Sequence, residues 1–260
     1  MTKFSHQEMM HDKGFLHPMG FIDDLKWEHV RENTIEAMRK HGYVWWKEGT
    51  HEQAIKLRNF LGQHVYTTDV KSKEGSKAML SKKGGIGPHT DHHDVDFVLW
   101  YVHQACSDGG ETMLYPFERV LRRMSLVGGM FHPKYRDLKC KEHKVFPDDA
   151  GEHLVIQRTG QRQSIFRNLY LDCSIISGNI LDVHKPLLYY SFWLAKHQDL
   201  EDNKLWFMLF QQSIEVTLPL RGHLNQNDIF IFDNRLNMHA RTEYFDDKRH
   251  LERHWIKAVI

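Results

Sequence analysis

The sequence has few cysteines, and none of them form a paired motif. Cys106, Cys140 and Cys173 are odd in number and show no CxxC spacing. A disulfide framework and a cysteine-based structural zinc site are therefore both disfavoured. This cysteine usage is typical of a reducing compartment, and we expect a cytoplasmic protein.

The chain also lacks an excess of either charge and any long apolar run. Its 35 Lys+Arg residues balance 34 Asp+Glu residues, so there is no basic stripe of the kind that binds nucleic acid. No apolar stretch approaches the roughly 18 residues of a membrane span, and the first residues lack the apolar core of a signal peptide. We expect a soluble protein whose partner is a small molecule, with neither a nucleic acid nor a membrane involved.

The 260 residues suit one large domain or two small ones, and the first part of the chain is mainly helical in pattern. Apolar spacing predicts helices over 23–41, capped by Asp23 or Asp24, and over 51–62, with a strand at 43–46 between them. We expect this helix–strand–helix opening to pack on one side of a sheet.

From about residue 65 the pattern changes to short strands separated by turns. Residues 168–200 have no firm period, and we interpret them as an insertion or lid rather than a second domain. The chain therefore belongs to the α+β class with mainly β structure, in which helices flank a sandwich or barrel of short strands. The strands are expected at 96–102, 112–115, 215–219, 228–232 and 251–259, and further helices at 116–126 and 203–214.

The stretch Gly-Pro-His-Thr-Asp-His-His at 87–93 holds the most informative pattern. His89 and Asp91 are two residues apart, so on an extended strand they point to the same side and can converge on one metal ion. His239, which follows an apolar strand pattern, is the candidate for a third ligand. Two histidines and one carboxylate on one side of an ion, with its other positions open, are typical of non-haem Fe(II) oxygenases.

Two further features indicate an anion beside this metal. Arg249 and Arg253 are four residues apart on the last strand pattern and so share a face, and arginine binds carboxylates in a bidentate fashion. The turn Gly-Gly-Glu-Thr at 109–112 can bring the hydroxyl of Thr112 to the same anion.

The order GPHTD, GGET, IFDNRLNMHAR, RHLERHWI resembles the Fe(II)- and 2-oxoglutarate-dependent dioxygenases of the taurine dioxygenase and clavaminate synthase-like group. The motifs lie in residues 85–117 and 224–256. The resemblance implies one double-stranded β-helix (jelly-roll) domain over residues 1–260, with flanking N-terminal helices. It also implies these roles: His89, Asp91 and His239 as iron ligands and catalytic residues, Thr112 and Arg249 for 2-oxoglutarate, and Arg253 for an anionic group of the substrate. The two arginines can exchange their roles.

The resemblance further implies the reaction. With O2, 2-oxoglutarate is converted to succinate and CO2 while an unactivated C–H bond of a small polar, amino-acid-like or acidic molecule is hydroxylated. Halogenases of this group replace the carboxylate ligand by a small residue, so Asp91 favours the other oxidative outcomes. Desaturation, cyclisation or epimerisation with the same cofactors is one alternative, and a non-catalytic metal-binding jelly-roll module is another.

Four more histidines adjoin these motifs. His92 points away from the ligand face of the strand and is expected near the site's periphery or at the surface, whereas His93 shares the ligand face. His250 and His254 lie on the other face from the two arginines, and we expect them to be structural.

Overall fold

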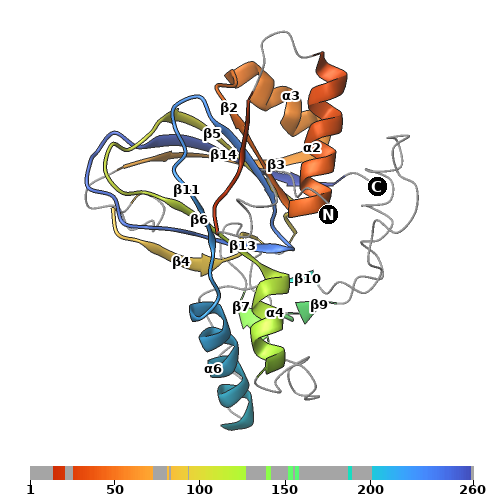
Figure 1. Cartoon of the computed structure of the whole chain (residues 1–260), viewed down its shortest axis with the longest axis vertical. Helices are drawn as coiled ribbons and strands as arrows, with labels where there is room; N and C mark the ends of the chain where they lie inside the picture. The colour runs from red at the N-terminus through yellow and green to blue at the C-terminus, as the bar shows by residue number, and fades with distance from the viewer. Residues whose placement is uncertain are drawn as a thin grey trace, which may run out of the picture.

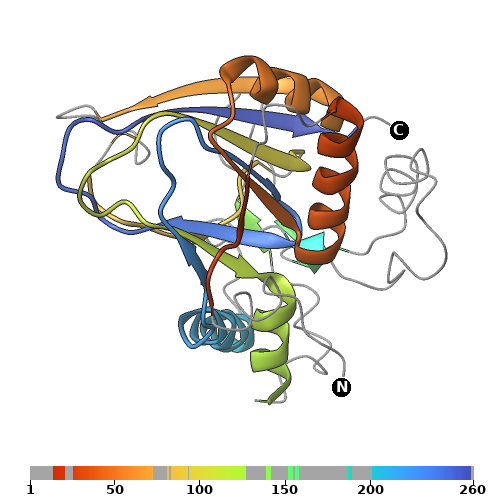
Figure 2. The ribbon, with the colours of Figure 1, turned by 45° about the horizontal axis from the view of Figure 1, so that its top comes forward.

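The computed structural model describes residues 14–20, 26–72, 81, 83–92, 94–126, 139–141, 152–154, 156–157, 187–188 and 201–258. Within these ranges it has two larger β-sheets that face each other, with helices outside them (Figures 1 and 2). The predicted mainly β architecture is confirmed. None of the described helices is long and apolar enough to cross a membrane.

The larger sheet has six strands and is antiparallel except at its β1–β2 edge. In spatial order its strands are β1 (Pro18–Gly20), β2 (Tyr43–Lys47), β12 (Ile229–Asp233), β5 (Phe97–Gln104), β14 (His250–Lys257) and β3 (Gln63–Lys71). The central strands β12 and β5 are apolar on both sides because one side meets the second sheet and the other meets helices.

The smaller sheet has four antiparallel strands and carries most of the predicted motifs. Its order is β11 (Leu220–Gly222), β6 (Thr112–Pro116), β13 (Asn237–Arg241) and β4 (Ile86–His89). Two short pairs complete the described strands, namely β7 (Lys139–Lys141) with β8 (Glu152–Leu154), and β9 (Ile156–Gln157) with β10 (Leu187–Leu188).

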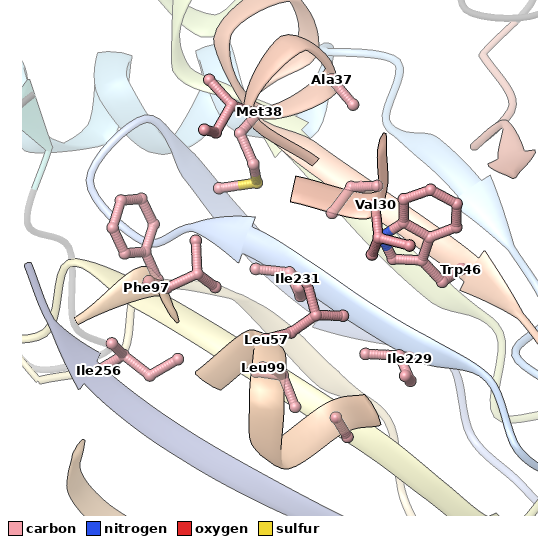
Figure 3. Close-up of a cluster of buried hydrophobic side chains, with 14 of the residues drawn as sticks. Val30, Ala37, Met38, Trp46, Leu57, Phe97, Leu99, Ile229, Ile231 and Ile256 are labelled. Atoms are coloured by element: carbon pink, nitrogen blue, oxygen red, sulfur yellow. The ribbon is translucent and has the colours of Figure 1, made fainter. Parts of the chain in front are cut away.

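Two helices cover the outer side of the six-stranded sheet, as the opening of the sequence predicts (Figure 2). They are α2 (Trp27–His41) and α3 (His51–Leu61). Figure 3 shows Val30 and Met38 of α2 and Leu57 of α3 meeting the outward side chains of β12 and β5 in one apolar cluster. Burial of such side chains, at roughly 1.5–3 kcal/mol each, ties the helices to the sheet.

A second apolar cluster fills the space between the two sheets. The inward side chains of the large sheet, such as Trp100 and Phe230, meet Leu114 and Leu220 of the small sheet. Both sheets therefore have fixed positions relative to each other, and a site built from both can be rigid.

The helices α4 (Phe117–Leu126) and α6 (Glu201–Glu215) lie beside each other beyond the small sheet (Figure 1). The predicted strand at 215–219 is wrong. Val216 and Thr217 have strand propensity, but their N–H groups bond back to the carbonyls of Gln212 and Ile214 and so prolong the end of α6. The strand β11 begins only at Leu220.

Two other predictions concern residues that lie wholly or mostly outside the described part of the chain. Lys26 precedes α2 and gives it no side-chain cap, while Asp23 and Asp24 lie outside the described residues. Of the predicted lid at 168–200 only Leu187–Leu188, which is β10, is described. The lid and the single-domain organisation stay predictions.

Candidate metal and anion site

The small sheet brings His89 and His239 face to face. His89 ends β4 and His239 is the middle residue of β13, and the two are direct Cα partners across the antiparallel pair. Directly opposed residues project to the same side of a sheet, and here the ring centroids are 4.2 Å apart. Strand pairing therefore assembles two candidate ligands that are 150 positions apart in the sequence.

Asp91 completes a group of three potential ligands. Its Oδ1 lies 4.0 Å from Nε2 of His89 and 3.8 Å from Nε2 of His239. One ligand atom from each residue falls within 4.8 Å of the others, and all three side chains are buried. Two imidazoles and one carboxylate that converge in this way are a ligand set suited to a divalent cation.

The orientation of His89 suits metal binding. Its Nδ1 donates a hydrogen bond to the carbonyl of Gly87, over 2.9 Å. With the proton on Nδ1, the lone pair of Nε2 faces the other two ligands. Such an outer hydrogen bond fixes the tautomer and the ring angle of a ligating histidine.

The carboxylate of Asp91 is fixed by two donors from the opposite sheet. Arg253 Nη1 donates to Oδ1 over 2.8 Å, and the indole N–H of Trp255 donates to Oδ2 over 2.7 Å. The backbone N–H of Asp91 donates to Oδ1 of the buried Asn234, over 2.7 Å. Each carboxylate oxygen has a second lone pair, so these bonds orient the group and still leave it able to bind a metal.

A second part of the site is positively charged and contains Arg241, Tyr244 and Arg249, which we call the positive segment. Arg241, on β13 two residues from His239, donates through Nη2 to the carbonyl of Gly84 over 2.6 Å. Arg249 lies one residue before β14 rather than on it. Among the described residues, no carboxylate lies within ion-pair distance of Arg249.

Burial affects the pKa of both arginines. It lowers the pKa of Arg241, and burial together with the nearby charge of Arg241 lowers the pKa of Arg249 to about 10. Both guanidinium groups are still charged at neutral pH, although burial away from water disfavours that state for both and the charge of Arg241 disfavours it for Arg249. An anion between or beside them would relieve the cost of burial and repulsion.

The ring of Tyr244 lies close to both arginines. Its ring centroid is 4.3 Å from the guanidinium carbon of Arg241 and 5.7 Å from that of Arg249. The side chain is fully buried, and its hydroxyl has no hydrogen-bond partner within the described part of the chain. A buried hydroxyl beside two cations is placed to donate to a bound anion.

The predicted turn at 109–112 packs on this segment. Gly109 and Gly110 have φ values of +74° and +70°, which glycine adopts without strain. The N–H of Gly110 donates to the carbonyl of Glu243 over 2.8 Å. Thr112 then starts β6 as the direct partner of Arg241, and its side chain is buried. The turn thus places Thr112 beside the positive segment.

The structure therefore gathers the predicted residues into two adjoining groups. His89, Asp91 and His239 lie together with Arg253, while Thr112 and Arg249 both adjoin Arg241. His92 is buried, with its ring 5.7 Å from that of Trp255, so a surface position is wrong for it. His93 lies outside the described residues.

The sequence interpretation missed four residues of the site. Arg241 has a signal, because it is two positions from His239 and must share its face on a strand. Trp255 is likewise two positions from Arg253. Asn234 and Tyr244 have no sequence signal, since only the packing of their loops brings them to the site.

No family model and no curated protein sequence matches this chain. Solved structures do. AAD-2 in complex with Mn(II) and N-oxalylglycine is 15% identical with a TM-score of 0.68, covering 95% of this chain and 96% of its own. A taurine dioxygenase from Burkholderia xenovorans is 16% identical with a TM-score of 0.63, covering 94% and 86%. An asparagine oxygenase in complex with Fe(II), 3-hydroxyasparagine and succinate is 15% identical with a TM-score of 0.61, covering 89% and 80%. The chain therefore has the fold of these oxygenases, as the sequence motifs predict.

Proposed function

We propose that this protein is an Fe(II)- and 2-oxoglutarate-dependent oxygenase that hydroxylates an unactivated C–H bond of a small polar molecule. The observation that carries the proposal is the convergence of His89, Asp91 and His239 within a buried interior. Two imidazoles and one carboxylate on one side of a metal are the ligand set of such enzymes. The architecture we infer is a double-stranded β-helix, formed by the two facing sheets as one domain.

The orientations of the three candidate ligands suit an iron ion. His89 presents Nε2 because its Nδ1 is bonded to Gly87, and the Asp91 carboxylate is held at a fixed angle by Arg253 and Trp255. His239 faces them from the neighbouring strand. When bound, Fe(II), 2-oxoglutarate and O2 supply the oxidising power, with succinate and CO2 released. The protein orients these groups and excludes water.

The positive segment suits a dicarboxylate co-substrate. We assign Arg249 to the distal carboxylate of 2-oxoglutarate because it is buried, charged and has no carboxylate partner among the described residues. Arg241 and the hydroxyl of Tyr244 adjoin the same point, and Thr112 faces Arg241 across the strand pair. Four donors of this kind would bind and orient an anion strongly in a water-poor interior.

We assign Arg253 to an acidic group of the substrate as well as to Asp91. Its Nη1 is used by Asp91, whereas its Nε is buried and finds no acceptor among the described residues. A substrate carboxylate would satisfy that donor directly beside the metal ligands. This favours an amino-acid-like or acidic substrate, and the asparagine oxygenase of the same fold is consistent with that class.

The test begins with Fe(II) and 2-oxoglutarate under anaerobic conditions. Chelation of the metal by the co-substrate should give a weak visible charge-transfer band, which His239→Ala should abolish and Arg249→Ala should shift to higher co-substrate concentration. His29→Ala, a change on the exposed side of α2, is the control and should match wild type. Wild-type protein that binds Fe(II) but shows no response to 2-oxoglutarate would instead be a metal-binding module.

The second stage identifies the substrate and outcome. Amino acids and small acids are screened for succinate formation coupled to oxygen uptake, and the products are analysed by mass spectrometry. A product that gains one oxygen atom supports hydroxylation. A product that loses two hydrogen atoms shows desaturation and contradicts it.

A further inference from the structure

A second group of histidines lies on the opposite side of the large sheet from the metal and anion site. His51 is the first residue of α3, His103 lies near the end of β5, and Glu252 lies on β14. We call these three residues the outer cluster. Glu252 stands between Leu251 and Arg253, which face the other sheet, so its side chain points outward toward α3.

The ligand atoms of the outer cluster converge closely. Oε2 of Glu252 is 3.2 Å from Nε2 of His51 and 3.3 Å from Nε2 of His103, and all three atoms lie within 4.8 Å of one another. On a tetrahedral Zn(II) ion with bonds of 2.0–2.1 Å, neighbouring ligand atoms are about 3.3 Å apart. The two separations from Glu252 Oε2 are close to that spacing, and the two histidine nitrogens lie within 4.8 Å of each other.

Neighbouring groups fix the rings in this arrangement. His103 stacks on His250 with centroids 4.4 Å apart and meets the ring of Tyr101 edge-on at 4.9 Å. The capping box at Thr50 fixes the first turn of α3, and with it the backbone of His51. Three separate elements thus present one ligand atom each from held positions, as a metal site requires.

We propose that the outer cluster is a Zn(II) site that fastens α3 to β5 and β14, with its fourth position open to water. In the metal-free protein, the two imidazoles donate their Nε2 protons to Glu252. Binding of the ion would displace those two protons from Nε2. Each neutral imidazole would then carry its proton on Nδ1 instead, with no net proton release, so that both Nε2 lone pairs and the carboxylate oxygen become ligands. The set of two nitrogens and one oxygen suits Zn(II), and the solvent-exposed side of His51 gives the ion a path of entry.

This proposal does not depend on the proposed function, and the experiment separates the two. Protein stripped of metal is dialysed against Zn(II), and bound zinc per chain is measured for wild type, His51→Ala, His103→Ala and Glu252→Gln. The group of His89, Asp91 and His239, the inner triad, should bind Zn(II) as well, so we expect wild type to hold two ions. Each outer variant should lose one of them, with its affinity at that site reduced at least about 100-fold. His29→Ala is the matched control, and thermal unfolding without metal checks that every variant folds.

The variant His239→Ala tests whether the second Zn(II) ion is bound at the outer cluster. It should still bind one Zn(II), which the added change His51→Ala removes. One ion in wild type that is lost by His51→Ala and kept by His239→Ala supports the outer cluster and contradicts the inner triad. The proposal is overturned if His51→Ala and His103→Ala bind Zn(II) with the stoichiometry and affinity of His29→Ala. His51→Ala removes only an exposed side chain, so it remains informative even if His103→Ala fails to fold.

Discussion

The indole N–H of Trp255 donates to Oδ2 of Asp91 over 2.7 Å, on the other oxygen from the one bound by Arg253. Asp91 follows a strand of the small sheet, whereas Trp255 and Arg253 lie on β14 of the large sheet. One sheet therefore supplies the candidate ligands, and the other sets the angle of the carboxylate. Rigid packing between the sheets is thus part of the site.

Replacing Trp255 by Phe should weaken metal binding while the protein still folds. The ring remains, but Asp91 loses one of two orienting donors, and outer partners of this kind typically contribute 10- to 100-fold in metal affinity. The measurement is Fe(II) affinity by anaerobic titration. Trp46→Phe is the control, because it removes an indole N–H that donates to Thr34 on the outer side of the large sheet, away from Asp91. Equal losses of affinity in both variants would show that the Asp91 bond is unimportant.

Asn234→Ala should destabilise the protein and loosen the loop that carries Asp91. The buried amide accepts from the N–H of Asp91 and donates to the carbonyls of His92 and Val95. Its loss leaves buried polar groups unsatisfied and should cost about 2–4 kcal/mol in chemical denaturation. Asn59→Ala on the exposed side of α3 should change stability by no more than about 0.5 kcal/mol. A small effect at Asn234 would mean that water replaces its bonds.

Gly110→Ala should disrupt the turn below the positive segment. The residue has φ of +70°, and an added Cβ would overlap with Sγ of the buried Cys106. Backbone strain and this overlap together should cost about 2–3 kcal/mol, and binding of 2-oxoglutarate should weaken because Thr112 shifts. Gly20→Ala, at the end of β1, meets no atom within 4 Å and should behave as wild type. Urea denaturation measures the stability, and titration with 2-oxoglutarate measures the co-substrate affinity. Wild-type affinity for 2-oxoglutarate in Gly110→Ala would show that the turn does not contribute to co-substrate binding.

Tyr244→Phe should leave the stability of the co-substrate-free protein unchanged or slightly higher, because the removed hydroxyl is buried without a partner among the described residues. Affinity for 2-oxoglutarate should nevertheless fall about tenfold or more, since a hydrogen bond to a charged group contributes roughly 1.5–3 kcal/mol. Tyr101→Phe should show the opposite pattern. Its hydroxyl donates to Oδ1 of Asn227, so its loss lowers stability by about 1 kcal/mol without changing co-substrate affinity. Reduced stability in Tyr244→Phe would reveal an internal partner and contradict the anion-binding role.

The sequence could predict the elements whose periodicity is uninterrupted. The apolar runs that became β5 and β12 and the amphipathic spacing of α2 and α3 all lie close to their predicted positions. The prediction failed at 215–219, where β-branched residues lie within a turn that completes a helix. Local propensity could not decide there, because the hydrogen bonds from Val216 and Thr217 back to α6 outweigh it.

For the site, the sequence by itself determined which chemical groups are present and which of them share a face, because spacing along a strand fixes side-chain direction. Spacing related His89 to Asp91, whereas His239 was added from its position after an apolar strand pattern and from the motif resemblance. Only the tertiary structure decided that His239 pairs directly with His89, that Arg253 and Trp255 both donate to Asp91, and that the ring of Tyr244 lies close to two arginines. The pairs that involve His89 or Asp91 join residues about 150 positions or more apart, and they depend on strand register and sheet packing, which no local pattern encodes. The contacts of Tyr244 are local in sequence, but they depend on how the segment between β13 and β14 is folded.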